Sequence, residues 1–204
     1  MTNRVFDAGQ ESIRTQVGTT ILELIVGNLV TETTDALVNP AQASLFPGGT
    51  LDGEIHLWGG TRIWQECRAL NGCGTGDAKI TTDGDLQARY VIHTVGPIWS
   101  GGNDGEPDAL ASCYRRSLEV ASENGIHSIA FPAISTGNYG YPMEQAAEIA
   151  LRAVIAHLQE HHGLSQVRFV LKGRKAFAIH SAALDKMMAE EGLTETVPSD
   201  PGGA

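Results

Sequence analysis

The chain of 204 residues is poor in cysteine and in basic side chains. It has three cysteines, Cys67, Cys73 and Cys113, and this odd, widely spaced set argues against a disulfide framework. Lysine and arginine number 14 against 24 acidic residues, which gives a net charge of −10. That charge disfavours general binding to the backbone of nucleic acids, so an anionic ligand would have to be held locally by backbone dipoles.

Long apolar runs are also missing from the sequence. No segment approaches the ~20 apolar residues that a membrane-spanning helix needs, so we expect no membrane partner. Residues 1–10 lack the basic start and the apolar run of a secretory signal, which predicts a cytoplasmic location. With 42% hydrophobic residues and 24 glycines, the composition predicts one globular domain with many tight turns.

Cys67, Cys73 and His56 are metal-ligating residue types, but their spacing does not predict a metal site. These three residues lack the close C-x-x-C or H-x-x-x-H spacing that organises most zinc sites. We therefore expect neither a metal nor another cofactor.

The hydrophobic periodicity alternates between the strand and the helix pattern along the chain. It predicts strands at 12–17, 21–26, 35–39, 78–81, 90–95, 128–134 and 167–171, and helices from 53 onward with an interruption at Gly59-Gly60, at 108–124, at 143–160 and at 175–191. Pro142 is suited to be the first helical residue of the third helix. The fold class is therefore α/β, as a three-layer sandwich with a mostly parallel sheet and an antiparallel hairpin at its start.

Two glycine-bearing loops follow buried strands and lead into helices, one at Gly48-Gly49 and one at 135–142. In a parallel sheet such loops meet at the carboxyl ends of the strands, where amide N–H groups could cradle a diphosphate from two sides. Ordinary turn glycines are the alternative.

Several polar residues near these loops are candidates for chemistry. Asp52 is expected to cap a helix N-terminus, and its carboxylate could also accept a proton from water. Asn39 and Gln42 could bond sugar hydroxyl groups or saturate loop backbone. His56 could be a general base, but a structural role is preferred because no orienting partner is visible, and His93 is expected to be a core histidine. Tyr139 could stack on a ligand or pack on the next helix.

Four segments together carry a resemblance to a known family. They are Asp35-Ala-Leu-Val-Asn-Pro-Ala-Gln42, Pro47-Gly-Gly-Thr-Leu-Asp-Gly-Glu-Ile-His56, Val91-Ile-His-Thr-Val-Gly-Pro97 and Ala130-Phe-Pro-Ala-Ile-Ser-Thr-Gly-Asn-Tyr-Gly-Tyr-Pro142. In this order and spacing they resemble the macrodomain family, in particular its MacroD-type ADP-ribosyl hydrolases and O-acetyl-ADP-ribose deacetylases. The resemblance implies a three-layer α/β/α fold with a six-stranded or slightly extended mixed sheet at 20–192. Residues 1–19 would form an extension with an edge strand, and 193–204 a disordered tail.

The resemblance also implies a function. The chain would bind ADP-ribose or an ADP-ribosylated protein and would hydrolyse mono-ADP-ribose esters on acidic side chains, or O-acetyl-ADP-ribose, without a metal. Water would be activated near Asp52, with Asn39 and Gln42 beside it. The implied ligand-binding residues are Asn28, Leu29, Gly48, Gly49, Leu51, Ser135, Thr136, Gly137, Asn138, Tyr139 and Gly140.

The chain departs from the family pattern at four places. Gly27-Asn28-Leu29-Val30 replaces G-D-I-T, and Asn39-Pro40-Ala41-Gln42 replaces N-A-A-N. The four-glycine loop is reduced to Pro47-Gly-Gly-Thr50, and Lys172-Gly-Arg-Lys175 stands where an aromatic residue often covers the adenine. An Asn oxygen still accepts a hydrogen bond, but without charge assistance. Two alternatives therefore stay open: a non-catalytic reader of ADP-ribose, and a macrodomain acting on another nucleotide-linked substrate.

Overall fold

The computed structural model describes residues 3–7 and 10–191. In this part of the chain eight strands form one sheet, with four α-helices and a short 3₁₀ helix. The elements are β1 (Asn3–Asp7), β2 (Gln10–Val17), β3 (Thr20–Val26), η1 (Leu29–Thr31), β4 (Ala36–Ala41), α1 (Thr50–Leu70), β5 (Ala78–Thr82), β6 (Tyr90–Val95), α2 (Glu106–Glu123), β7 (Ser128–Phe131), α3 (Met143–Glu160), β8 (Gln166–Leu171) and α4 (Arg174–Glu191).

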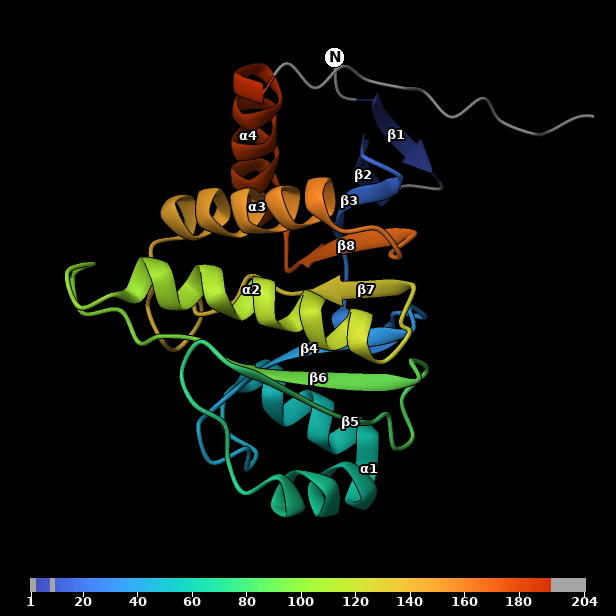
Figure 1. Cartoon of the computed structure of the whole chain (residues 1–204), viewed down its shortest axis with the longest axis vertical. Helices are drawn as coiled ribbons and strands as arrows, with labels where there is room; N and C mark the ends of the chain where they lie inside the picture. The colour runs from blue at the N-terminus through green and yellow to red at the C-terminus, as the bar shows by residue number, and fades with distance from the viewer. Residues whose placement is uncertain (1–2, 8–9, 192–204) are drawn as a thin grey trace, which may run out of the picture.

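The strand order is β1-β2-β3-β8-β7-β4-β6-β5 (Figure 1). The central strands pair in parallel, whereas β1 with β2, β2 with β3, and β5 with β6 pair antiparallel. The predicted three-layer α/β fold with a mixed sheet is confirmed. The sheet is wider than six strands because β1 and β2 extend it at the edge where the N-terminal extension was predicted. The predicted tail at 193–204 lies outside the described residues.

Two hydrophobic clusters occupy the two faces of the sheet. Ala36 and Val38 of β4 belong to the cluster that includes α2, α3 and α4, whereas Leu37 and Ala41 belong to the cluster with α1 and η1. This split follows from the strand geometry, since successive side chains point to opposite faces. Asn39 therefore shares the α1 side of the sheet with Leu37 and Ala41, and this places it near the start of α1.

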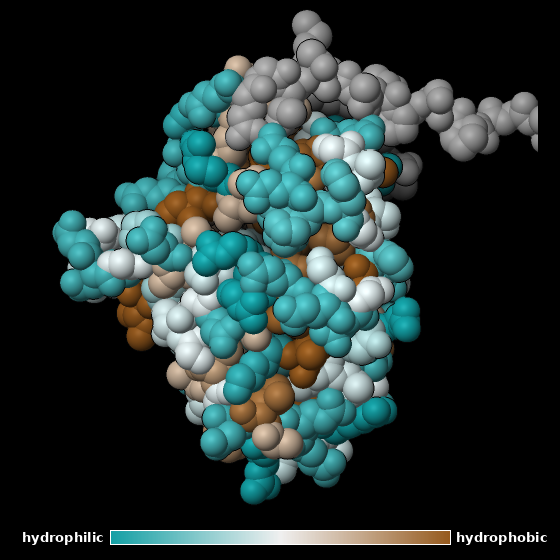
Figure 2. All heavy atoms as spheres, in the orientation of Figure 1, coloured by the Kyte–Doolittle hydropathy of each residue, from teal (hydrophilic) through white to brown (hydrophobic). Residues whose placement is uncertain are grey.

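The outer surface in the orientation of Figure 2 is mainly hydrophilic, with apolar residues in small separate patches. Among residues 3–7 and 10–191, no helix combines the length and the apolar character needed to cross a membrane.

The predicted interruption of the first long helix is confirmed. Gly60 has φ 70° and ψ −165°, so α1 consists of two helical segments joined at a kink. The kink packs against the turn at Gly84, where a Cβ atom would lie 1.8 Å from the carbonyl oxygen of Gly59. The amide of Asp85 donates to that same carbonyl at 3.2 Å. Glycine at 84 thus allows the turn to approach the kinked helix closely.

The start predicted for the first long helix is wrong by three residues, and the role predicted for Pro142 is wrong. Helix α1 begins at Thr50 with Gly49 as its N-cap, so Asp52 lies inside the first turn and is not the cap. The helix starts earlier, on Gly49, which makes no side-chain cap hydrogen bond, and Thr50 is already its first helical residue. Helix α3 begins at Met143, and Pro142 occupies the N-cap position with ψ 123° instead of the first helical position.

We predict that Gly84→Ala destabilises the protein more than Gly125→Ala. Both glycines have φ close to +60°, so a non-glycine residue at either position costs about 1 kcal/mol for its backbone conformation. Only at Gly84 does the new Cβ meet the Gly59 carbonyl, because nothing lies within 4 Å of a Cβ at Gly125. Urea unfolding should show an additional loss of about 2 kcal/mol for Gly84→Ala. Equal losses for the two variants would contradict the packing described for the kink.

Candidate functional site

A cleft of about 920 Å³ lies between the loop after β4 and the loop after β7. All but two of the predicted site residues line this cleft. The predicted residues that line it are Asn28, Leu29, Gln42, Gly48, Gly49, Leu51, Asp52, Ser135, Thr136, Gly137, Asn138 and Tyr139. Asn39 and Gly140 are not part of its lining. The two glycine-bearing loops therefore do face one common space, as expected for strands whose carboxyl ends meet at one edge.

Asp52 is a buried carboxylate at the bottom of the first loop, with 2% of its surface exposed. Its Oδ1 accepts a hydrogen bond from Asn39 Nδ2 at 2.6 Å, and its Oδ2 accepts one from the amide of Gly48 at 2.7 Å. The first turn of α1 supplies a further favourable field, because unpaired amide groups at a helix N-terminus attract negative charge. These donors explain how a carboxylate can be buried in a chain that is itself acidic.

His56 lies one helical turn after Asp52, and its Nε2 is 3.4 Å from Asp52 Oδ1. A carboxylate therefore lies beside His56, which the sequence did not reveal. Both ring nitrogens are buried and neither forms a hydrogen bond with the described residues. Asp52 and His56 thus form a close buried pair whose imidazole still has free hydrogen-bonding capacity.

Asn39 and Gln42 lie close to the first loop but have different roles in it. Asn39 is completely buried and donates to Asp52, while its Oδ1 has no partner among the described residues. Gln42 lies at the edge of the cleft, and its Nε2 donates to the carbonyl of Phe46 at 2.8 Å. Gln42 therefore stabilises the loop backbone, which was the structural alternative considered for it.

The second loop is stabilised by its own hydrogen bonds. The amide of Gly140 donates to Gly137 at 2.9 Å, and the amide of Tyr141 donates to Ser135 at 3.0 Å. Ser135 has φ 65°, a conformation that is strained for a residue other than glycine, and its buried Oγ has no partner among the described residues. A strained serine with an unused hydroxyl in a cleft is a candidate for contact with a ligand.

A glycine that the sequence analysis did not single out makes room for Ser135. Gly96 follows β6 and lines the cleft, and a Cβ on it would lie 2.2 Å from Ser135 Oγ. Val95-Gly96-Pro97 belongs to one of the four segments that resemble the macrodomain family. Why this position needs a glycine becomes clear only from the contact with Ser135.

The other end of the cleft is formed by η1, β8 and α1. Asn28 Oδ1 accepts from the amide of Val30 at 3.4 Å, so this oxygen also caps η1. Lys172 is the one basic side chain among the described residues of the lining, and its Nζ is 3.7 Å from Glu54 Oε1. Trp58, which is 62% exposed, also lines the cleft and is not among the residues predicted for the site.

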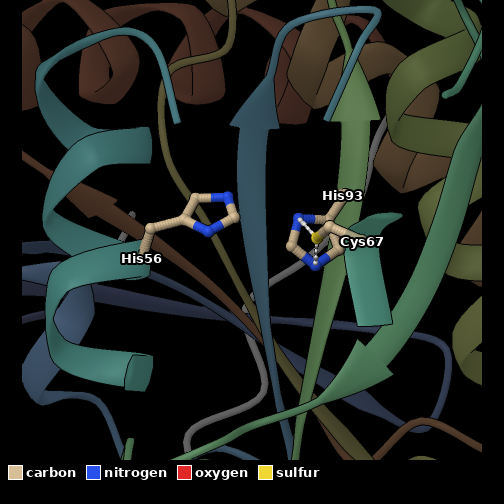
Figure 3. Close-up of side chains that lie close together, drawn as sticks. All are labelled: His56, Cys67 and His93. Carbon is tan, nitrogen blue, oxygen red and sulfur yellow. Dashed lines mark hydrogen bonds between the residues drawn. The ribbon is translucent and has the colours of Figure 1, made fainter. Parts of the chain in front are cut away.

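The metal set considered from the sequence is not the one that the structure brings together. Among the described residues, the ligand atoms of His56, Cys67 and His93 lie within 4.8 Å of one another, and Cys73 is not in this group (Figure 3). Burial, together with the charges of Asp52 and Glu66, raises the pKa of the Cys67 thiol to about 12. Without a metal ion Cys67 is therefore a thiol at neutral pH, and an ion that binds its sulfur would have to displace this proton.

A further histidine pair with metal-binding spacing was overlooked in the sequence. His157 and His161 stand four residues apart at the end of α3, and their rings stack with centroids 4.3 Å apart and an interplanar angle of 14°. His161 Nδ1 is 3.1 Å from the carbonyl of His157. The lone pairs of an imidazole lie in the plane of its ring, so two nearly parallel, stacked rings keep their lone pairs in separate planes and do not share one ion as they stand.

Comparison with known proteins gives the family of this chain. The family model described as Macro domain matches residues 38–150, which is more than half of the chain. The chain belongs to the macrodomain family. A macro domain-containing protein of Caldanaerobacter subterraneus is 48% identical over 170 residues, which cover 81% of this chain and 97% of the relative. A Klebsiella pneumoniae protein described as an O-acetyl-ADP-ribose deacetylase is 46% identical over 79% of this chain and 95% of that protein.

Solved macrodomain structures resemble this fold over most of the chain. The Oceanobacillus iheyensis macrodomain with ADP has a TM-score of 0.85 and 37% identity, over 89% of this chain and 98% of that one. The Trypanosoma brucei macrodomain in complex with ADP-ribose has a TM-score of 0.76 and 37% identity, over 80% of this chain and 68% of that one. The macrodomain fold that the four sequence segments predicted is thus confirmed.

We predict that Asn39→Asp destabilises this macrodomain by about 3 kcal/mol at pH 7 and much less at pH 4. The variant places two carboxylates together, which raises the pKa of the pair above the ~3.9 of an unfolded aspartate. The folded variant then binds a proton more tightly than the unfolded chain, so its stability is retained below about pH 4 and is lost as the pH rises.

Thermal unfolding at several pH values measures this difference. Asn39→Leu is the control, because it removes the donor to Asp52 without adding a charge and should show a weaker dependence on pH. The same pH dependence in both variants would contradict the direct contact between Asn39 and Asp52.

Proposed function

We propose that this macrodomain binds ADP-ribose in the cleft and hydrolyses esters of ADP-ribose, with Asp52 holding the water that reacts. The substrates would be mono-ADP-ribose linked to acidic side chains of proteins, or O-acetyl-ADP-ribose. In either case water adds across the ester bond, so that one product gains its hydroxyl group and the other gains its proton. The products are ADP-ribose and a carboxylic acid.

The observation that carries this proposal is the position of the Asp52 carboxylate. It is buried, it is held by Asn39 and Gly48, and it still lines the cleft between the two loops. A fixed carboxylate at the bottom of a cleft can orient a water and accept its proton. The description of the Klebsiella pneumoniae relative as an O-acetyl-ADP-ribose deacetylase supports the same reaction.

The composition of the lining supports an anionic ligand that is bound by backbone. Two loops with exposed or half-buried glycines, Gly48, Gly49 and Gly137, line the cleft, and α1 begins directly at Gly49. Amide groups at a helix N-terminus and in glycine loops suit a diphosphate without requiring Lys or Arg. The Oceanobacillus iheyensis and Trypanosoma brucei macrodomains, solved with ADP and with ADP-ribose, support a nucleotide diphosphate as ligand.

A second candidate function is a reader that binds ADP-ribose without hydrolysing it. One observation favours it: each oxygen of Asp52 already accepts a hydrogen bond from the protein, as a purely structural carboxylate would. In addition, the side-chain amide of Gln42 is engaged by Phe46 and so does not point freely at a ligand.

We predict that Asp52→Ala lowers hydrolysis at least 100-fold, since loss of a general base typically removes a factor of 10²–10⁴. Glutamate-linked mono-ADP-ribosylated protein and O-acetyl-ADP-ribose are the substrates, and released ADP-ribose is the readout. Glu123→Ala, which removes an exposed carboxylate on α2, is the control and should keep the wild-type rate.

Calorimetry with ADP-ribose separates the two candidate functions. Tight binding together with turnover by the wild-type protein is the expected result. Tight binding without turnover would establish the reader, and equal turnover by the wild-type protein and Asp52→Ala would remove Asp52 from the reaction.

A further inference from the structure

A row of three polar side chains crosses neighbouring strands beneath α1. Asn39 of β4 is the register partner of His93 of β6, and Thr81 lies on the adjacent strand β5. All three side chains are buried. Asn39 Nδ2 lies 3.1 Å from His93 Nδ1, and Thr81 Oγ1 lies 2.9 Å from His93 Nε2.

The directions of these hydrogen bonds follow from chemistry. A carboxylate only accepts, so the nitrogen of the Asn39 amide must face Asp52, and the same nitrogen is the donor to His93 Nδ1. His93 then carries its hydrogen on Nε2 and donates it to Thr81, whose hydroxyl donates to the carbonyl of Thr82 at 3.0 Å. Burial, with a smaller effect of His56, lowers the pKa of His93 to about 3, so the ring stays neutral.

This arrangement uses both hydrogens of the Asn39 amide group. One goes to Asp52 and the other to His93, and rotation of the amide would break both bonds at once. The remaining support of Asp52 from the protein backbone, the amide of Gly48, comes from a loop with exposed residues. The Asn39 side chain therefore links strand β4 to Asp52 by a hydrogen bond, and the hydrogen bond to His93 sets the orientation of the Asn39 amide.

We propose that His93 is a positioning residue, which holds the Asp52 carboxylate in its reactive orientation through the side-chain amide of Asn39. This inference rests on the proposed function, because it assigns His93 a role in the same hydrolysis. His93 does not line the cleft, so it acts on the reaction only through Asn39 and Asp52. The core histidine expected from the sequence thus has a specific task in addition to packing.

A metal ion bound by His56, Cys67 and His93 is the competing explanation of this cluster. Cys67 Sγ lies 3.6 Å from His93 Nε2 and 3.9 Å from Nδ1, and so approaches both nitrogens of the ring (Figure 3). The rings of His56 and His93 have centroids 6.1 Å apart. An ion on His93 would have to displace either Asn39 or Thr81, whereas the hydrogen-bonded row accounts for both nitrogens.

The test compares His93→Asn with His93→Gln. In the Asn variant, Oδ1 takes the place of Nδ1 and still accepts from Asn39, whereas the Gln variant places its amide at the Nε2 end and leaves Asn39 without this acceptor. Both variants lose the ring and its packing. We expect kcat for hydrolysis to fall at least 10-fold in His93→Gln and about threefold or less in His93→Asn, with the Kd of ADP-ribose unchanged in both. Equal losses of kcat would overturn the proposal, because they would show a packing role alone.

A second measurement does not depend on turnover. Nitrogen-15 NMR of the wild-type protein should show His93 with a protonated Nε2 and an unprotonated Nδ1. The Asn39 amide hydrogens should be protected from exchange in the wild type and in His93→Asn but not in His93→Gln. A proton on Nδ1, or equal protection in both variants, would overturn the positioning role even if the wild-type protein hydrolyses nothing.

The same NMR experiment tests the metal explanation. Protein freed of metals with a chelator and then given Zn²⁺ should keep its histidine spectrum. A change at both His56 and His93 on addition of Zn²⁺ would overturn the proposal in favour of a metal site.

Discussion

The buried carboxylate of Asp52 is the constraint on which the site depends. A charge that is removed from water must be compensated by donors, and Asn39 and Gly48 provide them. The two donors come from different segments, the end of β4 and the loop before α1. The hydrogen bonds of one carboxylate therefore connect the sheet, the loop and the first turn of the helix, and the loop and the helix turn line the cleft.

The rest of the cleft follows from the acidic character of the chain. With a net charge of −10 and Lys172 already near Glu54, an anion finds little help from side chains. Backbone amides are the remaining donors, and they reach a ligand best where side chains are absent. Gly96 also lacks a side chain for a reason, since a Cβ there would occupy the space of the Ser135 hydroxyl group. That hydroxyl group has no hydrogen-bond partner among the described residues.

Local sequence patterns predicted the strands and helices well, because each is a segment with one apolar face that must be buried. The glycine pair at 59 and 60 likewise revealed the kink of α1. The start of that helix was misplaced because Asp52 resembles an N-cap, whereas the N-cap residue is Gly49, which makes no side-chain cap hydrogen bond. The contact of Asn39 with His93 depends on the register of β4 and β6. The need for glycine at position 96 depends on its contact with Ser135 in a distant loop. Neither can be derived from a single segment.

The hydrogen bonds of Asp52 also indicate where a water can bind. Each carboxylate oxygen has two lone pairs, and Oδ1 already faces both Asn39 and His56. Oδ2 accepts only the amide of Gly48 among the described residues and so keeps one lone pair free. A carboxylate held by two donors is thus compatible with catalysis, provided that the water approaches Oδ2 from the cleft. Asn39 and Gly48 each use one lone pair, on different oxygens, and the His56 ring beside Oδ1 leaves Oδ2 as the more open oxygen.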